Sequence, residues 1–276
     1  MSTTLRLPAV AGRFYPSDPQ NLRDEIVTFT RVSVKPDAGK AKIRALGCVV
    51  PHAGYVYSGG VAGAVYERLE LPQRYIILCP NHTGRGEPLA IMSQGAWRTP
   101  LGDVPVDEDL ASAVKVCLPL LAEDDTAHRS EHALEVQLPF LQVLRPDFRF
   151  VPIVVGTAQF EVLAALGVSI ASVIRECGND VLVVASSDMN HYENDSITRV
   201  KDRRAIDQIL ELNPKGLYDV VRRASISMCG YGPTVAMLTA ALKQGATKAE
   251  LIRYATSGDV SGDRDMVVGY AGIAVC

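Results

Sequence analysis

The sequence predicts an α/β protein, a single three-layer α/β/α sandwich with a mostly parallel or mixed central sheet. Several short apolar runs are rich in Val and Ile, which is typical of strands covered on both faces. Segments with helical periodicity separate these runs, and this alternation is typical of α/β domains. The 276 residues contain no internal repeat, low-complexity stretch or clear linker, which favours one domain over residues 1–276.

The expected elements follow from these periodicities. Strands are expected at residues 44–50, 74–80, 149–155, 180–186 and 266–275. Helices are expected at residues 19–31, 58–69, 107–117, 131–144, 159–177, 196–211 and 230–243. The first helix follows the turn sequence PSDP, and Ser58 and Ser130 are suitable caps for two others. The polar segment 34–42, with Pro and Gly, is expected to be a surface loop.

Composition excludes several classes of protein. A net charge of −3 does not indicate binding to nucleic acid, and no apolar run approaches the ~18 residues of a membrane span. The N-terminus lacks the basic start and apolar core of a signal peptide. The six cysteines form no CxxC pair, and Cys48 and Cys79 lie in apolar runs where small buried side chains are expected. We therefore expect a cytoplasmic protein without membrane contact.

Four of the five histidines lie in short polar segments, most of them at the ends of expected strands. His52 and His82 each follow such a strand by two residues, His191 follows the strand 180–186, and His132 lies in SEHALEVQLPF. Ligands bind at the carboxyl ends of strands in open α/β sheets, and histidine is the commonest metal ligand. The sequence therefore predicts one metal-binding site built from distant segments.

Other side chains extend this prediction. Cys229, in SMCGYGP, precedes an expected helix whose N-terminus would lower the pKa of the thiol, although a small buried side chain is the alternative. Asp188 is expected to orient an imidazole and His191 to act as acid or base beside the metal. A hydrolytic triad of Ser186 with these two residues is a weaker alternative, because no GxSxG motif is present.

His132 and Glu135 are three residues apart, so both would lie on one face of the expected helix 131–144. They could serve the site together or form a surface pair. His128 is expected to be structural or exposed. The GG-x-x-G spacing at residues 59–63 matches no nucleotide-binding motif, and the acidic segment 257–265 lacks the spacing of a calcium loop.

Six motifs occur in an order that resembles the Memo family, which includes the bacterial and archaeal component B of an AmmeMemoRadiSam system. They are AGRFYP, VPHAGYVYSG, PNHTG, EHALEVQLPF, SSDMNHY and MCGYGP, and they span nearly the whole chain. The resemblance implies a fold like that of class III extradiol ring-cleaving dioxygenases. It implies metal ligation by His52, His82 and Cys229. It also implies a pocket in which Asp188 and His191, with His132 and Glu135 nearby in motif, are the catalytic candidates.

The resemblance and the donor types together predict a non-haem iron site, with copper or zinc as alternatives because a thiolate accepts all three. The expected activity is redox or dioxygenase-like chemistry on a small molecule. The alternatives are a non-catalytic protein that binds a peptide or a metal, and an accessory factor whose partner is a radical-SAM enzyme. Turnover of dioxygen with a panel of catechols would separate an enzyme from a binding protein, and co-purification with a radical-SAM protein would support the accessory role.

Overall fold

The computed structural model describes residues 4–37, 41–178 and 180–276, and it has a mixed sheet at its centre. Four parallel strands form the middle of this sheet: β2 (Gly47–Val50), β9 (Val181–Ser186), β3 (Arg74–Pro80) and β8 (Arg149–Val155), adjacent in that order. Antiparallel neighbours flank them. They are β12 (Val267–Val275), beside β2 and paired also with β10 (His191–Glu193) and β11 (Ala249–Thr256), and β4 (Leu89–Ile91), beside β8 and paired with β7 (Ala122–Glu123).

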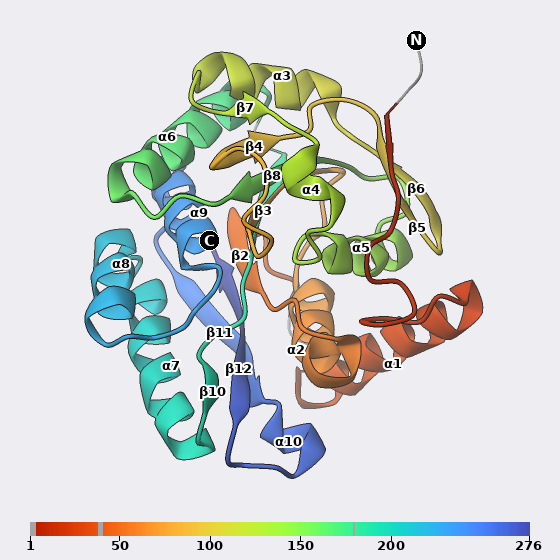
Figure 1. The fold of residues 1–276 in the computed structure, drawn as a ribbon, viewed down its shortest axis with the longest axis vertical. Coiled ribbons are helices and arrows are strands. Elements are labelled where there is room, and N and C mark those ends of the chain that lie inside the picture. Colours follow the sequence, from red (N-terminus) through yellow and green to blue (C-terminus); the bar gives the residue numbers. More distant parts are fainter. Residues whose placement is uncertain (1–3, 38–40, 179) are drawn as a thin grey trace.

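Helices cover both faces of the sheet, as Figure 1 shows. On one face α9 (Tyr231–Lys243) packs on β2, β3 and β9, with α6 (Phe160–Glu176) and α8 (Pro214–Arg223) against it, and α7 (Asp195–Leu210) beside α8. On the other face α2 (Tyr55–Arg68) packs on β2, β11 and β12, with α1 (Pro19–Asp37) and α5 (Leu138–Leu144) outside it. The predicted three-layer α/β/α sandwich is confirmed.

The remaining elements lie at the periphery. β1 (Leu5–Arg6), β5 (Ala96–Thr99) and β6 (Gly102–Pro105) form a small separate sheet. α3 (Glu108–Cys117), α4 (Thr126–Arg129), the 3-10 helix η1 (Glu135–Gln137) and α10 (Gly258–Ser261) complete the described chain. None of the helices in the described ranges is long and apolar enough to cross a bilayer.

Burial explains why the central strands are apolar along their whole length. Every residue of β2 and β9 is buried, and so is every residue of β3 and β8 after the first. Strands covered on both faces cannot alternate polar and apolar side chains without leaving polar groups unpaired. Cys48 and Cys79 lie fully buried in two of these strands and are free thiols, as predicted.

Two helix starts differ from the prediction. Helix α2 begins at Tyr55 with Gly54 as its cap, and the Ser58 hydroxyl donates to the Ala53 carbonyl inside the first turn. The predicted helix 131–144 is wrong at its start, because helical structure begins only at Glu135. The Glu131 carboxylate accepts the Ala133 amide and so stabilises a non-helical loop there.

Other differences concern segments with weak apolar patterns. Residues 34–37 continue helix α1, so the predicted surface loop is wrong there, and residues 38–40 lie outside the described residues. The short strands β4 to β6, the helix α8 and the edge strand β11 were not predicted. Strand β11 is only partly buried along most of its length, so it lacks the continuous apolar run that marks a central strand.

Candidate metal centre

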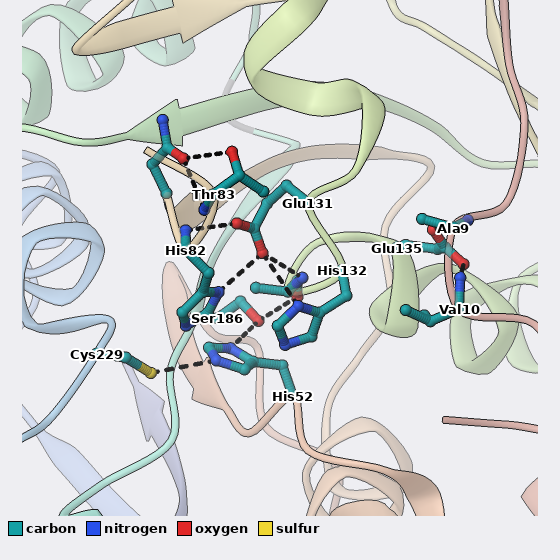
Figure 2. Close-up of polar contacts among 12 residues, drawn as sticks. Ala9, Val10, His52, His82, Thr83, Glu131, His132, Glu135, Ser186 and Cys229 are labelled. Atoms are coloured by element: carbon teal, nitrogen blue, oxygen red, sulfur yellow. Dashed lines mark hydrogen bonds and ion pairs between the residues drawn. The ribbon is translucent and has the colours of Figure 1, made fainter. Parts of the chain in front are cut away.

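Three imidazoles converge at the carboxyl ends of the parallel strands. His52 follows the end of β2 and His82 follows the end of β3, on either side of β9, while His132 comes from the loop before η1. The ring centroids of His52 and His82 are 5.1 Å apart, and those of His82 and His132 are 4.7 Å apart. One ligand nitrogen from each ring lies within 4.8 Å of the others (Figure 2). This group could hold a metal ion.

Hydrogen bonds hold the outer side of these rings. His82 Nδ1 lies 2.9 Å from Glu131 Oε1, and the His82 amide donates to Glu131 Oε2 at 2.6 Å. His52 Nδ1 lies 3.0 Å from Ser186 Oγ. Figure 2 shows both contacts as dashed lines. When Nδ1 of a histidine is held in this way, Nε2 is left for a metal or a substrate.

Glu131 and Ser186 were not predicted as parts of the metal site. Glu131 directly precedes His132 in sequence, but it supports His82, 49 residues away. The sequence shows only a carboxylate directly before His132, and a contact between distant segments cannot be inferred from spacing.

Cys229 also faces this group. It lies directly before the cap residue Gly230 of α9, is half-buried, and its sulfur is 3.2 Å from His52 Nε2. The expected lowering of its pKa by the helix N-terminus is wrong: burial raises the pKa of the Cys229 thiol well above its ordinary value. Without a metal it is therefore a neutral thiol, and a bound metal would have to displace its proton.

Asp188 and His191 line the same pocket but make different contacts from those expected. The Asp188 carboxylate accepts the backbone amide of His52 at 2.7 Å, so among the described contacts it holds the main chain of a histidine and not an imidazole ring. Burial raises the pKa of Asp188 to about 7. His191 Nδ1 lies 2.9 Å from the Ser227 carbonyl, and burial lowers the pKa of this half-buried ring.

The pocket has a volume of about 570 Å³, sufficient for a small molecule. Its lining combines the candidate ligands with a few apolar side chains and consists of Phe14, His52, Ala53, Gly54, His82, His132, Asp188, His191, Tyr192, Ser227, Cys229 and Val268. Phe14 belongs to the AGRFYP motif, and its ring packs 4.8 Å from that of His132. The N-terminal motif therefore supplies one wall of the pocket.

Glu135, predicted as a catalytic candidate, lies outside this pocket. Its buried carboxylate pairs with Arg6 and accepts the backbone amides of Ala9 and Val10 and the hydroxyl of Tyr15. Because residues 131–134 are not helical, Glu135 and His132 do not share a helical face, and Figure 2 shows Glu135 directed towards the N-terminal segment. All the described contacts of Glu135 serve to anchor that segment.

His128 also lies outside the lining of this pocket. It is fully buried against Trp97, with the two ring centroids 5.6 Å apart. Burial lowers the pKa of His128 to about 4, so the ring is neutral at physiological pH. The sequence predicted that His128 is either structural or exposed, and its burial supports a structural role.

The electrostatics suit a divalent metal. Burial and the neighbouring imidazoles hold the pKa of His52 well below its ordinary value, and burial also lowers that of His132. For His82, burial opposes the charged form, but the Glu131 carboxylate outweighs it and raises the pKa. The neutral imidazoles of His52 and His132 are donors that iron, copper and zinc all accept, and a bound metal would displace any proton from Nε2 of His82. Two nitrogens that bind one metal at ~2.0–2.1 Å are at most ~4.2 Å apart. The three imidazole nitrogens, which lie within 4.8 Å of one another, would therefore have to approach only slightly to bind a metal.

Comparisons with known proteins agree with this architecture. The model of the family described as Memo-like protein matches residues 6–274. MEMO1 family proteins of Methanothermobacter thermautotrophicus and Methanopyrus kandleri are each 44% identical, with 97% of this chain aligned to 99% and 98% of theirs. A crystal structure of an uncharacterized Escherichia coli K12 protein has a TM-score of 0.55 at 13% identity, covering 84% of this chain and 100% of that one. That likeness supports the fold alone. The chain belongs to the Memo-like protein family.

Proposed function

We propose that this chain is a non-haem metalloprotein that carries out redox or dioxygenase-like chemistry on a small molecule, with iron as the expected metal and copper or zinc as rivals. The observation that carries the proposal is the convergence of three imidazole nitrogens within 4.8 Å at one end of the sheet. Their position beside a pocket of about 570 Å³ gives a substrate access to the metal.

Two overlapping ligand sets are available, and His52 and His82 belong to both. Cys229, predicted as the third ligand, approaches His52 to 3.2 Å, whereas His132, predicted as a catalytic residue, completes the imidazole group. We assign the metal to His52, His82 and Cys229, and treat His132 as the residue that either completes the shell or faces the substrate. Metal sites that do chemistry keep a position open, whereas closed four-ligand sites are structural.

The other pocket residues have roles that follow from their contacts. Because the carbonyl of Ser227 can only accept, the hydrogen of the neutral His191 ring lies on Nδ1, and Nε2 has the lone pair that can accept a proton. Asp188 fixes the main chain at His52 and so holds one metal ligand in place. When bound, the metal would supply Lewis acidity or electron transfer at this point.

The test is metal analysis of protein purified without oxygen, followed by reloading with iron(II), copper(I) or zinc. We expect one metal per chain in the parent and near-complete loss in His52→Ala and His82→Ala. Cys229→Ser should lose more metal than Cys117→Ser, which changes an exposed thiol and serves as the matched control. Equal metal content in the parent and the His52→Ala and His82→Ala variants would contradict the proposal.

A non-catalytic metal-binding protein is the second candidate, and the position of His132 favours it. If His132 and Cys229 both bind the metal together with His52 and His82, no position remains open for a substrate. Loss of metal in both His132→Ala and Cys229→Ser, without oxygen consumption by the loaded parent, would support this candidate. Retention of metal in His132→Ala would favour the open, reactive site.

A further inference from the structure

The partner of His52 Nδ1 differs in kind from the partners of the other held rings. The Glu131 carboxylate and the Ser227 carbonyl can only accept, so Nδ1 of His82 and of His191 must carry the hydrogen. The Ser186 hydroxyl, 3.0 Å from His52 Nδ1, can either donate or accept. If it donated, the hydrogen of His52 would be on Nε2, and this nitrogen could not bind a metal.

The other contacts of Ser186 remove this choice. The Ala133 carbonyl lies 2.5 Å from Ser186 Oγ and can only accept, so it takes the hydroxyl hydrogen. Gln137 Nε2 lies 2.8 Å from the same oxygen and donates to it. The hydroxyl thus gives one hydrogen and receives another, and what it offers His52 is a lone pair. His52 Nδ1 must then be the donor.

The orientation of the Gln137 amide is set by two further partners. The Pro51 carbonyl, which can only accept, lies 3.0 Å from Gln137 Nε2, and the Tyr66 hydroxyl donates to Gln137 Oε1 at 2.8 Å. A flipped amide would place Oε1 against the Pro51 carbonyl and against Ser186. Gln137, Ser186 and Tyr66 are all fully buried, so water cannot relieve such a contact.

We infer that Tyr66, Gln137 and Ser186 are positioning residues that hold His52 in the tautomer with hydrogen on Nδ1 and a free Nε2. The Tyr66 hydroxyl donates to the Gln137 amide, Gln137 donates to Ser186, and His52 Nδ1 also donates to Ser186. His52 is the ring that belongs to both candidate ligand sets. The use of the free nitrogen rests on the proposed metal site, but the tautomer is a property of the metal-free protein.

The direct test is nitrogen-15 NMR of the imidazoles in the metal-free, labelled protein, with the His52 signals assigned by their loss in His52→Gln. We expect Nδ1 of His52 to be protonated and Nε2 to be unprotonated at neutral pH. The opposite tautomer in the parent protein would overturn the inference.

Two variants separate positioning from packing. Ser186→Ala removes the acceptor of the His52 Nδ1 hydrogen, and Gln137→Leu removes a hydrogen bond that holds this acceptor oxygen in place, so both should give mixed His52 tautomers and a zinc Kd raised ~10–100-fold. Gln142→Leu is the matched control, because Gln142 also accepts from a hydroxyl, that of Thr99, and donates to a carbonyl, that of Gly102. Its tautomers and its zinc Kd should equal those of the parent.

The outcomes distinguish the two hypotheses. Unchanged His52 tautomers and an unchanged zinc Kd in both site variants would contradict the positioning role, even if their melting temperatures fall. A parent that binds no zinc, iron or copper would contradict the proposed function, while the NMR measurement would still decide the tautomer.

Discussion

At the scale of single residues, the support of His82 depends on one buried carboxylate. The two carboxylate oxygens of Glu131 accept from the backbone amide and from Nδ1 of His82. Glu131→Gln replaces one of these oxygens with an NH₂ group, which cannot accept from either donor. We expect the zinc Kd to rise ~10–100-fold, as is typical for loss of a partner of a metal ligand. Competition with a chromophoric chelator measures this, and an unchanged Kd would show that Glu131 does not serve the metal.

The same pair predicts how the stability of the metal-free protein depends on pH. Because the folded state raises the pKa of His82, the stability gained from its charged pair with Glu131 is present below the unfolded pKa of ~6.5 and is lost as pH rises through the folded value. The stability difference between the parent and Glu131→Gln should therefore shrink from pH ~6 to ~8. Urea unfolding at several pH values measures it, and a difference that grows with pH would contradict the sign.

Glu135 is the contrasting case, because it lies in one of the six sequence motifs but its contacts anchor the N-terminal segment. Glu135→Gln leaves the buried guanidinium of Arg6 without its counter-charge, and removal of one partner of a buried pair costs ~3–5 kcal/mol. We expect that loss in urea unfolding, with the zinc Kd of the folded protein unchanged. Exposed Glu176→Gln should change neither quantity. A Kd change as large as that of Glu131→Gln would return Glu135 to the metal site.

At the scale of elements, the glycines of α2 serve helix packing. A Cβ on Gly63 would lie 2.9 Å from the backbone of Phe29 in α1, whereas a Cβ on Gly60 would meet only the Arg253 guanidinium, at 3.7 Å or more. Gly63 therefore lets α1 and α2 approach each other closely. This contact explains the glycine at position 63 of the segment 59–63, whose spacing matches no nucleotide-binding motif.

This packing predicts opposite effects for two similar substitutions. Gly63→Ala should destabilise the protein by ~1–3 kcal/mol, because α1 cannot yield without moving its backbone. Gly60→Ala should be neutral or stabilise by up to ~1 kcal/mol, through the higher helix propensity of alanine. Urea unfolding of both variants compares them, and equal destabilisation would contradict the close approach at Gly63.

The central strands could be predicted because a strand covered on both faces must be apolar throughout. Once the ends of these strands were known, the histidines that directly follow them could be placed at one edge of the sheet. The loop at residues 131–134 could not be predicted, because its conformation depends on contacts of Glu131 with a residue 49 positions away. For the same reason the prediction of a helix with His132 and Glu135 on one face was wrong. The contacts by which Glu131, Gln137 and Ser186 support the histidines were not predicted. Local periodicity does not report hydrogen bonds between distant segments.

At the scale of the whole molecule, the described residues form one layered arrangement with the pocket at the carboxyl edge of its sheet. The single domain over residues 1–276, the cytoplasmic location and the radical-SAM partner stay predictions. Co-purification from native cells with the metal retained tests the partner. A stable complex that changes the metal content or the redox state of the site would support the accessory role.

The central claim is that His52 and His82 bind one metal through Nε2 at this pocket. Anomalous diffraction at the metal edge, from crystals of protein purified without oxygen and reloaded with iron(II), tests it most directly. We predict one peak at ~2.0–2.3 Å from both Nε2 atoms, with Cys229 as the third ligand. A peak elsewhere in the molecule, or an empty pocket in crystals whose protein carries stoichiometric iron, would contradict the account.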